Sequence, residues 1–129
     1  MKRKSSISQV NGPLPTDEQL FAMVEHAIRH EKGYLDKDLN REILAERMGI
    51  HRNSLSRVVN RFTGVNFPTY VASLRLAEVK RLVHTKKHSK VTELAAEAGF
   101  ASRMAFYRAA KKVADVSASL FIKTEKANR

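Results

Sequence analysis

The sequence contains no cysteine and no tryptophan, and only five glycines and three prolines among its 129 residues. The absence of cysteine excludes disulfides and thiolate metal sites. Aromatic residues make up 7% of the chain against 43% apolar residues, a balance that favours helices over a β-sandwich. No apolar run approaches the roughly 18 residues of a membrane span, and the basic start lacks the apolar segment of a secretory signal. We therefore expect an all-α, cytoplasmic protein that makes no membrane contact.

Acidic residues are also scarce. The chain has 24 lysines and arginines but only 13 aspartates and glutamates, which gives a formal net charge of +11. A surplus of this size in so small a protein indicates a polyanionic partner, usually nucleic acid or an anionic membrane surface. Solubility alone is the alternative explanation.

The first half of the chain predicts three helices behind a flexible basic tail, residues 1–15. Thr16 and Gln19 form the pattern of a capping box, so the first helix runs from about residue 17 to 30, and Gly33 is a suitable C-cap for it. Asn40 is a suitable N-cap for a second helix at 41–48, which Gly49 ends. A third helix follows and closes at Gly64, with an inward face made of Leu55, Val58, Val59 and Phe62.

A longer helix is predicted over "NFPTYVASLRLAEVKRLVH", with Asn66 as its N-cap and Pro68 in its first turn. Its apolar residues cover a wide arc rather than one stripe. A helix that packs on two sides needs such an arc, so we expect this one to join two cores. Helices near 91–98 and 103–113 follow, with a short one after Ser117, which gives about seven helices in all.

Two stretches resemble each other: "LAERMGIHRNSLSRVVNRF" from Leu44 and "LAAEAGFASRMAFYRAAKK" from Leu94. In each, an alanine lies four residues before a glycine, and a basic helix follows. This pattern is typical of a helix-turn-helix, because a small residue lets the second helix approach and the glycine forms the turn. An all-helical protein-interaction adaptor, whose charges form only a solvated face, is the alternative.

The arrangement resembles the DNA-binding domain of the AraC/XylS family of transcription regulators, which has two helix-turn-helix subdomains joined by a long helix. The likeness covers roughly residues 34–123. It includes "LSR" at 55–57 and the second-unit core "AAEAGFASRMAFYR" at 95–108, and it is closest to the Bacteroidetes-type branch. We accordingly divide the chain into the tail 1–15, a first subdomain 16–66, a linker helix 67–84 and a second subdomain 85–129.

The resemblance implies a sequence-specific regulator of transcription, usually an activator that contacts RNA polymerase. Its partner is double-stranded DNA, and two recognition helices on one chain let a monomer read successive major-groove segments, about 34 Å apart. A DNA-binding module of a recombination enzyme is a further alternative. The resemblance assigns DNA contacts to the early residues of each recognition helix: Arg52, Asn53, Ser56, Arg57, Arg103, Met104, Tyr107 and Arg108. We expect Arg61, Arg75, Lys111 and Lys112 to be backbone-contacting or structural groups.

The second unit departs from the family pattern. Ala110 stands where a phenylalanine is usual, and Asp115 and Ala118 replace a glycine and a proline. In the first unit, His51 replaces a serine-like N-cap, and histidine is a poorer cap. These departures predict a looser second unit.

No catalytic or metal site is expected. The pairs His26/His30 and His84/His88 have the spacing of metal ligands, but neither has a third ligand nearby in the pattern. There is no glycine-rich phosphate loop and no arrangement typical of a nucleophile with its base. We therefore predict no enzymatic activity and no cofactor.

Overall fold

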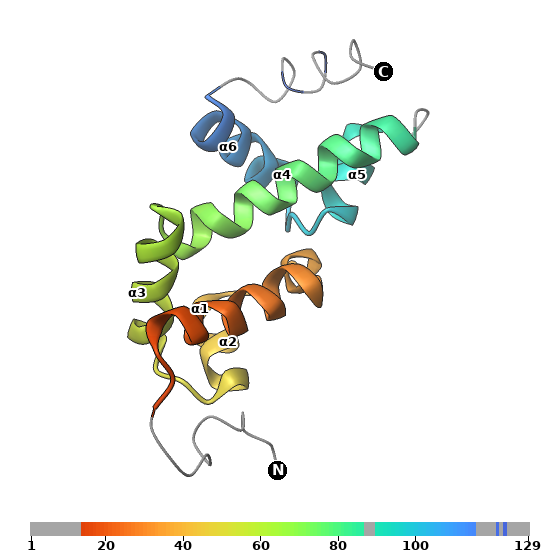
Figure 1. Ribbon diagram of the computed structural model, residues 1–129. Coiled ribbons are helices and arrows are strands. Elements are labelled where there is room, and N and C mark those ends of the chain that lie inside the picture. The colour runs from red at the N-terminus through yellow and green to blue at the C-terminus, as the bar shows by residue number, and fades with distance from the viewer. Residues whose placement is uncertain (1–13, 87–89, 116–120, 122, 124–129) are drawn as a thin grey trace. The chain divides into compact units, whose positions relative to one another are not determined.

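The computed structural model describes residues 14–86, 90–115, 121 and 123. Within them every regular element is helical, and six α-helices are formed (Figure 1): α1 Asp17–Glu25, α2 Arg41–Met48, α3 Arg52–Thr63, α4 Phe67–Thr85, α5 Val91–Glu97 and α6 Arg103–Ala114. Residues 1–13 of the predicted tail 1–15 and most of the predicted helix after Ser117 lie outside the described residues. None of the described helices combines the length and apolar composition of a membrane span.

The helix starts follow the predicted caps. Thr16 and Gln19 form a reciprocal capping box, in which the Gln19 N–H donates to Thr16 Oγ1 and the Thr16 N–H donates to Gln19 Oε1. Asn40 Oδ1 accepts the Ile43 N–H at 2.8 Å, and Asn66 Oδ1 accepts the Thr69 N–H at 2.9 Å. These side chains satisfy backbone donors that have no partner within their helices.

The end of the first helix differs from the prediction. α1 stops at Glu25, and a π-helical turn, His26–His30, continues it. The left-handed residue that ends this turn is Lys32, with φ of 59°, rather than Gly33. Gly33 instead starts a 3-10 turn, Gly33–Leu35, at a point where a Cβ would lie 2.7 Å from the Ala27 carbonyl oxygen. The glycine is therefore required by close backbone approach.

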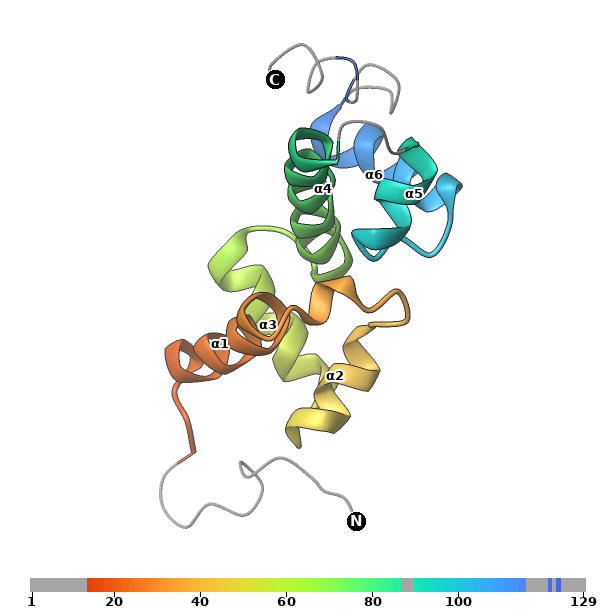
Figure 2. The same ribbon diagram turned by 90° about the vertical axis from the view of Figure 1, so that its right-hand side faces the viewer.

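The chain forms two compact units, one made of residues 1–33 and 39–70 and the other of 34–38 and 71–129. In the first unit α3 packs against both α1 and α2 (Figure 2). Leu55, Val58 and Val59 of α3 are fully buried, as predicted. Phe62 is not, because it stays 38% exposed while its ring stacks on Phe21 at a centroid distance of 5.1 Å.

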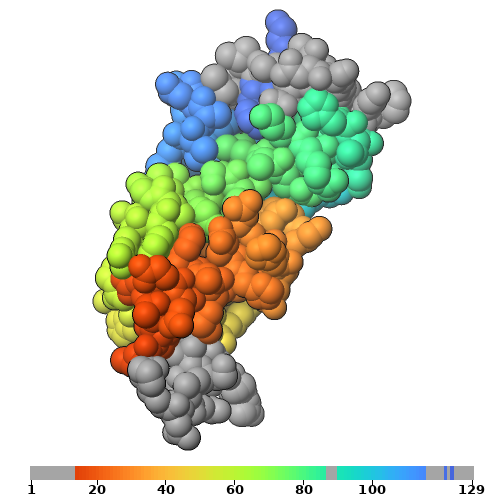
Figure 3. Space-filling view, viewed as in Figure 1, coloured from red at the N-terminus to blue at the C-terminus, as the bar shows by residue number. Residues whose placement is uncertain are grey.

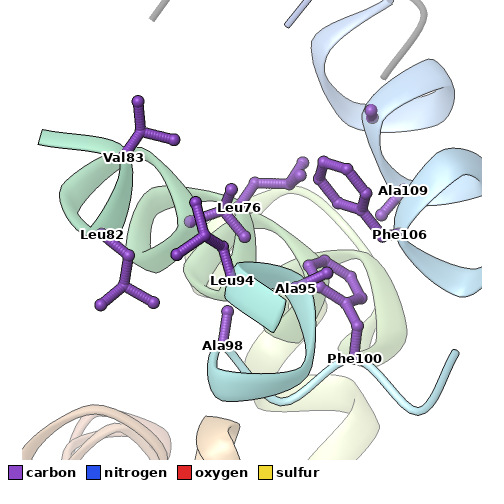
Figure 4. Close-up of a cluster of buried hydrophobic side chains, with 11 residues drawn as sticks. Leu76, Leu82, Val83, Leu94, Ala95, Ala98, Phe100, Phe106 and Ala109 are labelled. Atoms are coloured by element: carbon purple, nitrogen blue, oxygen red, sulfur yellow. The ribbon is translucent and has the colours of Figure 1, made fainter. Parts of the chain in front are cut away.

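The second unit is built on α4. Leu76, Leu82 and Val83 of α4 meet residues of α5 and α6, Phe106 among them, in one hydrophobic cluster (Figure 4). The predicted wide apolar arc of α4 has a simple reason. Phe67 and Tyr70 are buried in the first unit, whereas the helix from Val71 onward belongs to the second. The two cores thus share one continuous 19-residue helix.

Residues 34–38, which lie between the π-helical turn and α2, belong to the second unit, and their backbone is bonded to α4. The half-buried Arg75 donates from Nε to the Tyr34 carbonyl and from Nη2 to the Asp36 carbonyl, both at 2.7 Å. Burial lowers the pKa of Arg75, partly offset by Asp36. The expectation of a structural role for this arginine is confirmed, because its donors are used to hold chain 34–38 in place.

Candidate nucleic-acid interface

The exposed face of α3 is polar and basic, because its opposite face is used for packing. Since Leu55, Val58 and Val59 point into the core, the periodicity of the helix directs Asn53, Ser56 and Arg57 away from it. Arg52, Asn53 and Arg57 are exposed, and Ser56 is half-buried. All four residues predicted for this helix therefore lie outside the apolar contact.

The start of α3 is fixed by a histidine cap. His51 Nδ1 accepts the Asn53 N–H at 3.0 Å, so the imidazole fills the N-cap role despite histidine's weak preference for it. The bond also places Asn53 in the first turn of the helix, where recognition helices contact base edges.

Two helices flank this face and contribute side chains that the sequence analysis did not single out. From α2, Arg41 Nη1 donates to Ser56 Oγ at 2.8 Å, which leaves the Ser56 hydroxyl hydrogen available to another acceptor. From α1, the Asp17 carboxylate accepts from Arg57 Nη2 and Arg61 Nη1, each at 2.9 Å. The sequence places residue 17 only at the start of the first helix, and no local pattern connects Asp17 to an arginine forty positions away.

These bonds change the electrostatics of the α3 surface. Hydrogen bonds from Arg57 and then Arg61 lower the pKa of Asp17, and the hydrogen bond to Asp17 raises the pKa of Arg57. Asp17 is therefore ionised at neutral pH, and one negative charge lies between two arginines of α3. Figure 3 shows that the side chains of α1, in red and orange, adjoin those of α3, in yellow-green, on the molecular surface.

The equivalent helix of the second unit is α6, whose residues correspond to those of α3 at a spacing of 51 positions. Ser102 Oγ accepts the Ala105 N–H at 3.0 Å as its N-cap. Phe106, Ala109 and Ala110 are buried, and Arg103, Met104, Tyr107 and Arg108 are exposed. Met104 is 55% and Tyr107 is 39% exposed, so this face presents apolar and aromatic surface between two arginines.

The histidine pair of the first unit, His26 and His30, has the spacing of two metal ligands. The His26 and His30 rings stack at 5.5 Å, and His26 Nε2 lies 3.6 Å from a Glu31 carboxylate oxygen. Within the described residues, no three or more histidine, cysteine, aspartate or glutamate side chains are grouped so that they could hold a metal ion. His88, of the other predicted pair, lies outside the described residues.

The turn, the capped second helix and the buried apolar face occur twice, as a pair of helix-turn-helix units requires. A family model described as a helix-turn-helix domain matches residues 44–124, well over half of the chain. The chain belongs to the AraC-type helix-turn-helix family. The match begins at residue 44, within α2, and continues past α6, so it covers both turns and both second helices of this AraC-type chain, whereas α1 lies outside it.

Three solved structures are similar to this AraC-type chain. A protein of unknown function from Listeria innocua has a TM-score of 0.69 and 21% identity, over 81% of this chain and 96% of that one. The C-terminal domain of AraT, a response regulator from Geobacillus stearothermophilus, has a TM-score of 0.67 and 23% identity, over 83% and 85%. The C-terminal domain of the two-component response regulator yesN from Fusobacterium nucleatum has a TM-score of 0.67 and 22% identity, over 83% of this chain and 97% of that one.

At these identities the likeness establishes the fold, which is the predicted all-α fold with two helix-turn-helix units. No curated protein matches the chain in sequence. The predicted placement in the Bacteroidetes-type branch stays a prediction.

Proposed function

We propose that the chain is a sequence-specific DNA-binding regulator of transcription that inserts α3 and α6 into successive major-groove segments. One observation carries the proposal: two equivalent helices each bury an apolar face and expose a basic one, in an AraC-type chain of net charge +11. A basic exposed helix face is the electrostatic footprint expected of a DNA-binding surface. The predicted cytoplasmic location, the activator role and the contact with RNA polymerase belong to the same proposal.

The two recognition helices are suited to different bases. On α3, Arg52 and Arg57 have the donors to bridge guanine O6 and N7, and Asn53 has the donor and acceptor to pair with adenine. On α6, Met104 and Tyr107 offer apolar contact to thymine methyl groups, and Arg103 and Arg108 reach guanine or phosphate. We propose that a monomer thereby reads an asymmetric site.

Selection of bound duplexes from a random DNA pool tests this function. The expected result is an enriched asymmetric sequence with two conserved segments about one helical turn apart. With roughly six to eight phosphates neutralised, the logarithm of affinity for that sequence should fall with the logarithm of salt concentration at a slope of about −5 to −7.

Other outcomes identify the alternatives. A slope near −2 would mean that one unit alone engages DNA. Binding without any enriched sequence would favour a module of a recombination enzyme, and absence of binding would favour a protein-interaction adaptor.

A further inference from the structure

The feature that the proposed function leaves unexplained is an acidic residue beside the DNA-reading face. Asp17, in the first turn of α1, bonds to Arg57 through Oδ1 and to Arg61 through Oδ2. Glu18 adds a longer contact, with its carboxylate 3.8 Å from Arg61 Nη2. An acid that faces DNA weakens binding to phosphate, so its position on this surface requires an explanation.

Arg57 and Arg61 keep free N–H donors for DNA while they are bonded to Asp17. Each guanidinium has five N–H donors and donates one of them to Asp17. The Arg57 and Arg61 side chains stay 56% and 54% exposed. Asp17 itself is more enclosed, at 26% exposed. The carboxylate therefore fixes the orientation of the arginines without covering them, and it cancels part of their charge.

We propose that Asp17 is a positioning residue that raises the sequence specificity of α3, an inference that rests on the proposed DNA-binding function. It holds the Arg57 guanidinium in one orientation for a base edge, which reduces the rotamer freedom lost on binding the right sequence. At the same time its charge opposes the phosphate contacts that give binding to any sequence. Both effects widen the gap between specific and non-specific affinity.

The second recognition helix differs in this respect. Within the described part of the chain, the guanidiniums of Arg103 and Arg108 have no acidic partner, whereas Arg57 at the position equivalent to Arg108 has Asp17. The carboxylate is thus a property of the first unit and not of the helix-turn-helix fold. This difference confines the proposed effect to the DNA segment that α3 reads.

The test is Asp17→Asn, which removes the charge and keeps the shape. Affinity is measured for two duplexes: one selected by the wild-type chain from a random pool, and one of scrambled sequence. Affinity for the scrambled duplex should rise about threefold or more, and its salt slope should steepen by about one for each further phosphate that the released arginines neutralise. The ratio of the two affinities should fall about five- to tenfold, part of what one good base contact contributes to discrimination.

Two control variants and one substitute variant separate the effect of this charge at position 17 from a change in net charge. Asp38→Asn makes the same change in net charge at an exposed residue that pairs with Lys37, and it should leave the ratio unchanged. Asp17→Glu keeps the charge and should keep most of the ratio. If Asp17→Asn melts below the assay temperature, Asp17→Ser carries the same expectation, because serine suits a helix start.

The failures are distinguishable. If the wild-type chain binds neither duplex in preference, the proposed function is wrong and this inference falls with it. If the wild-type chain prefers the selected duplex and a folded, uncharged variant keeps that ratio, the ion pairs are only structural and this inference alone is overturned.

Discussion

The recognition helices α3 and α6 are built on one plan and expose different chemistry. Each has a capped start, three buried residues in equivalent positions and a left-handed residue at its end. The buried residues of α3 are Leu55, Val58 and Val59; those of α6 are Phe106, Ala109 and Ala110. α3 therefore contributes three branched residues to its core, whereas α6 contributes one large ring and two small residues to the other core.

The difference continues on the exposed side. Asn53 and Ser56 of α3 are replaced by Met104 and Tyr107 in α6, and only α3 has an acid bound to its arginines within the described residues. Burial is the same in both helices because the fold dictates it, whereas the exposed residues are free to differ because nothing in the packing selects them. The same scaffold therefore supports two basic surfaces, one that adds polar residues and an ion pair and one that adds apolar and aromatic residues between its arginines.

The largest expected effect concerns the glycines Gly99 and Gly64. Both have positive φ, but a Cβ at Gly99 would lie 2.4 Å from the Tyr34 carbonyl oxygen and 2.9 Å from Leu35 Cα, whereas nothing lies within 4 Å at Gly64. Gly99→Ala should therefore destabilise the protein by about 2–5 kcal/mol, through strain and backbone displacement together.

Gly64→Ala is the matched control, because it tests the positive φ without the clash. It should lower the free energy of unfolding by only about 1–2 kcal/mol. Urea denaturation measures both variants. Equal losses would show that residues 34–38 do not pack tightly on the Gly99 turn.

The next effect concerns DNA. Arg57→Ala should weaken binding to the selected duplex by about 1–3 kcal/mol, as loss of a good base contact does. Arg108→Ala should weaken it less, because no described acid orients Arg108 and its unit departs from the family pattern. Arg29→Ala, an arginine of similar exposure at 54%, serves as control and should have little effect. A greater loss for Arg108→Ala than for Arg57→Ala would show that α6 contributes more to binding than α3 does.

Local features were predictable from the sequence because they depend on neighbouring residues. Thr16, Asn40 and Asn66 cap helices as expected, since a cap needs only a side-chain oxygen two or three residues from a free N–H. Asp115 takes a left-handed φ of 56° where the family has glycine, as aspartate can do at some strain. Helical periodicity likewise indicated which side of α3 and α6 would be buried.

Features that depend on tertiary packing were not predictable. Phe62 has inward spacing but stays 38% exposed, and its ring stacks on Phe21 of α1 rather than lying in the core with Leu55. The ion pairs of Asp17 and the fit of Gly99 against Tyr34 join residues that are far apart in sequence. The sequence indicates which residues α3 exposes, but which of them form ion pairs depends on how α1 packs against α3.

A smaller stability effect is expected at Ala110. From the sequence alone, an aromatic residue at this position would be expected to tighten the second unit, because the family usually has phenylalanine there. The Ala110 side chain is fully buried, and Phe121 packs on the same cluster, with its ring edge-on to Phe106 at 6.2 Å. We therefore expect Ala110→Phe to destabilise the protein by about 1–2 kcal/mol, because it overpacks a filled site.

The double variant Ala110→Phe, Phe121→Ala sharpens this test. If Phe121 fills the space of the family's usual aromatic, the double variant should be more stable than the sum of the two single changes predicts. Urea denaturation and amide exchange over residues 91–115 measure it. Slower exchange in the single variant Ala110→Phe would show instead that the site is vacant.

The smallest effect concerns pH and separates the two units again. The pKa of Asp17 lies below the ordinary value of 3.8 in the folded chain, because Arg57 and then Arg61 bond to the carboxylate. A lowered folded pKa means that the ion pairs stabilise the protein above the unfolded pKa, and that this contribution is lost as pH falls through the folded pKa.

The melting temperature of the wild-type chain should thus exceed that of Asp17→Asn at about pH 6 by a small margin, because exposed ion pairs contribute little. The margin should shrink below the ordinary pKa of 3.8 and vanish once Asp17 is protonated. Asp38→Asn provides the comparison, since Asp38 pairs only with its exposed neighbour Lys37 within the described residues. A margin that stays constant down to the acid limit would mean that Asp17 acts through its place at the start of α1 and not through the two arginines.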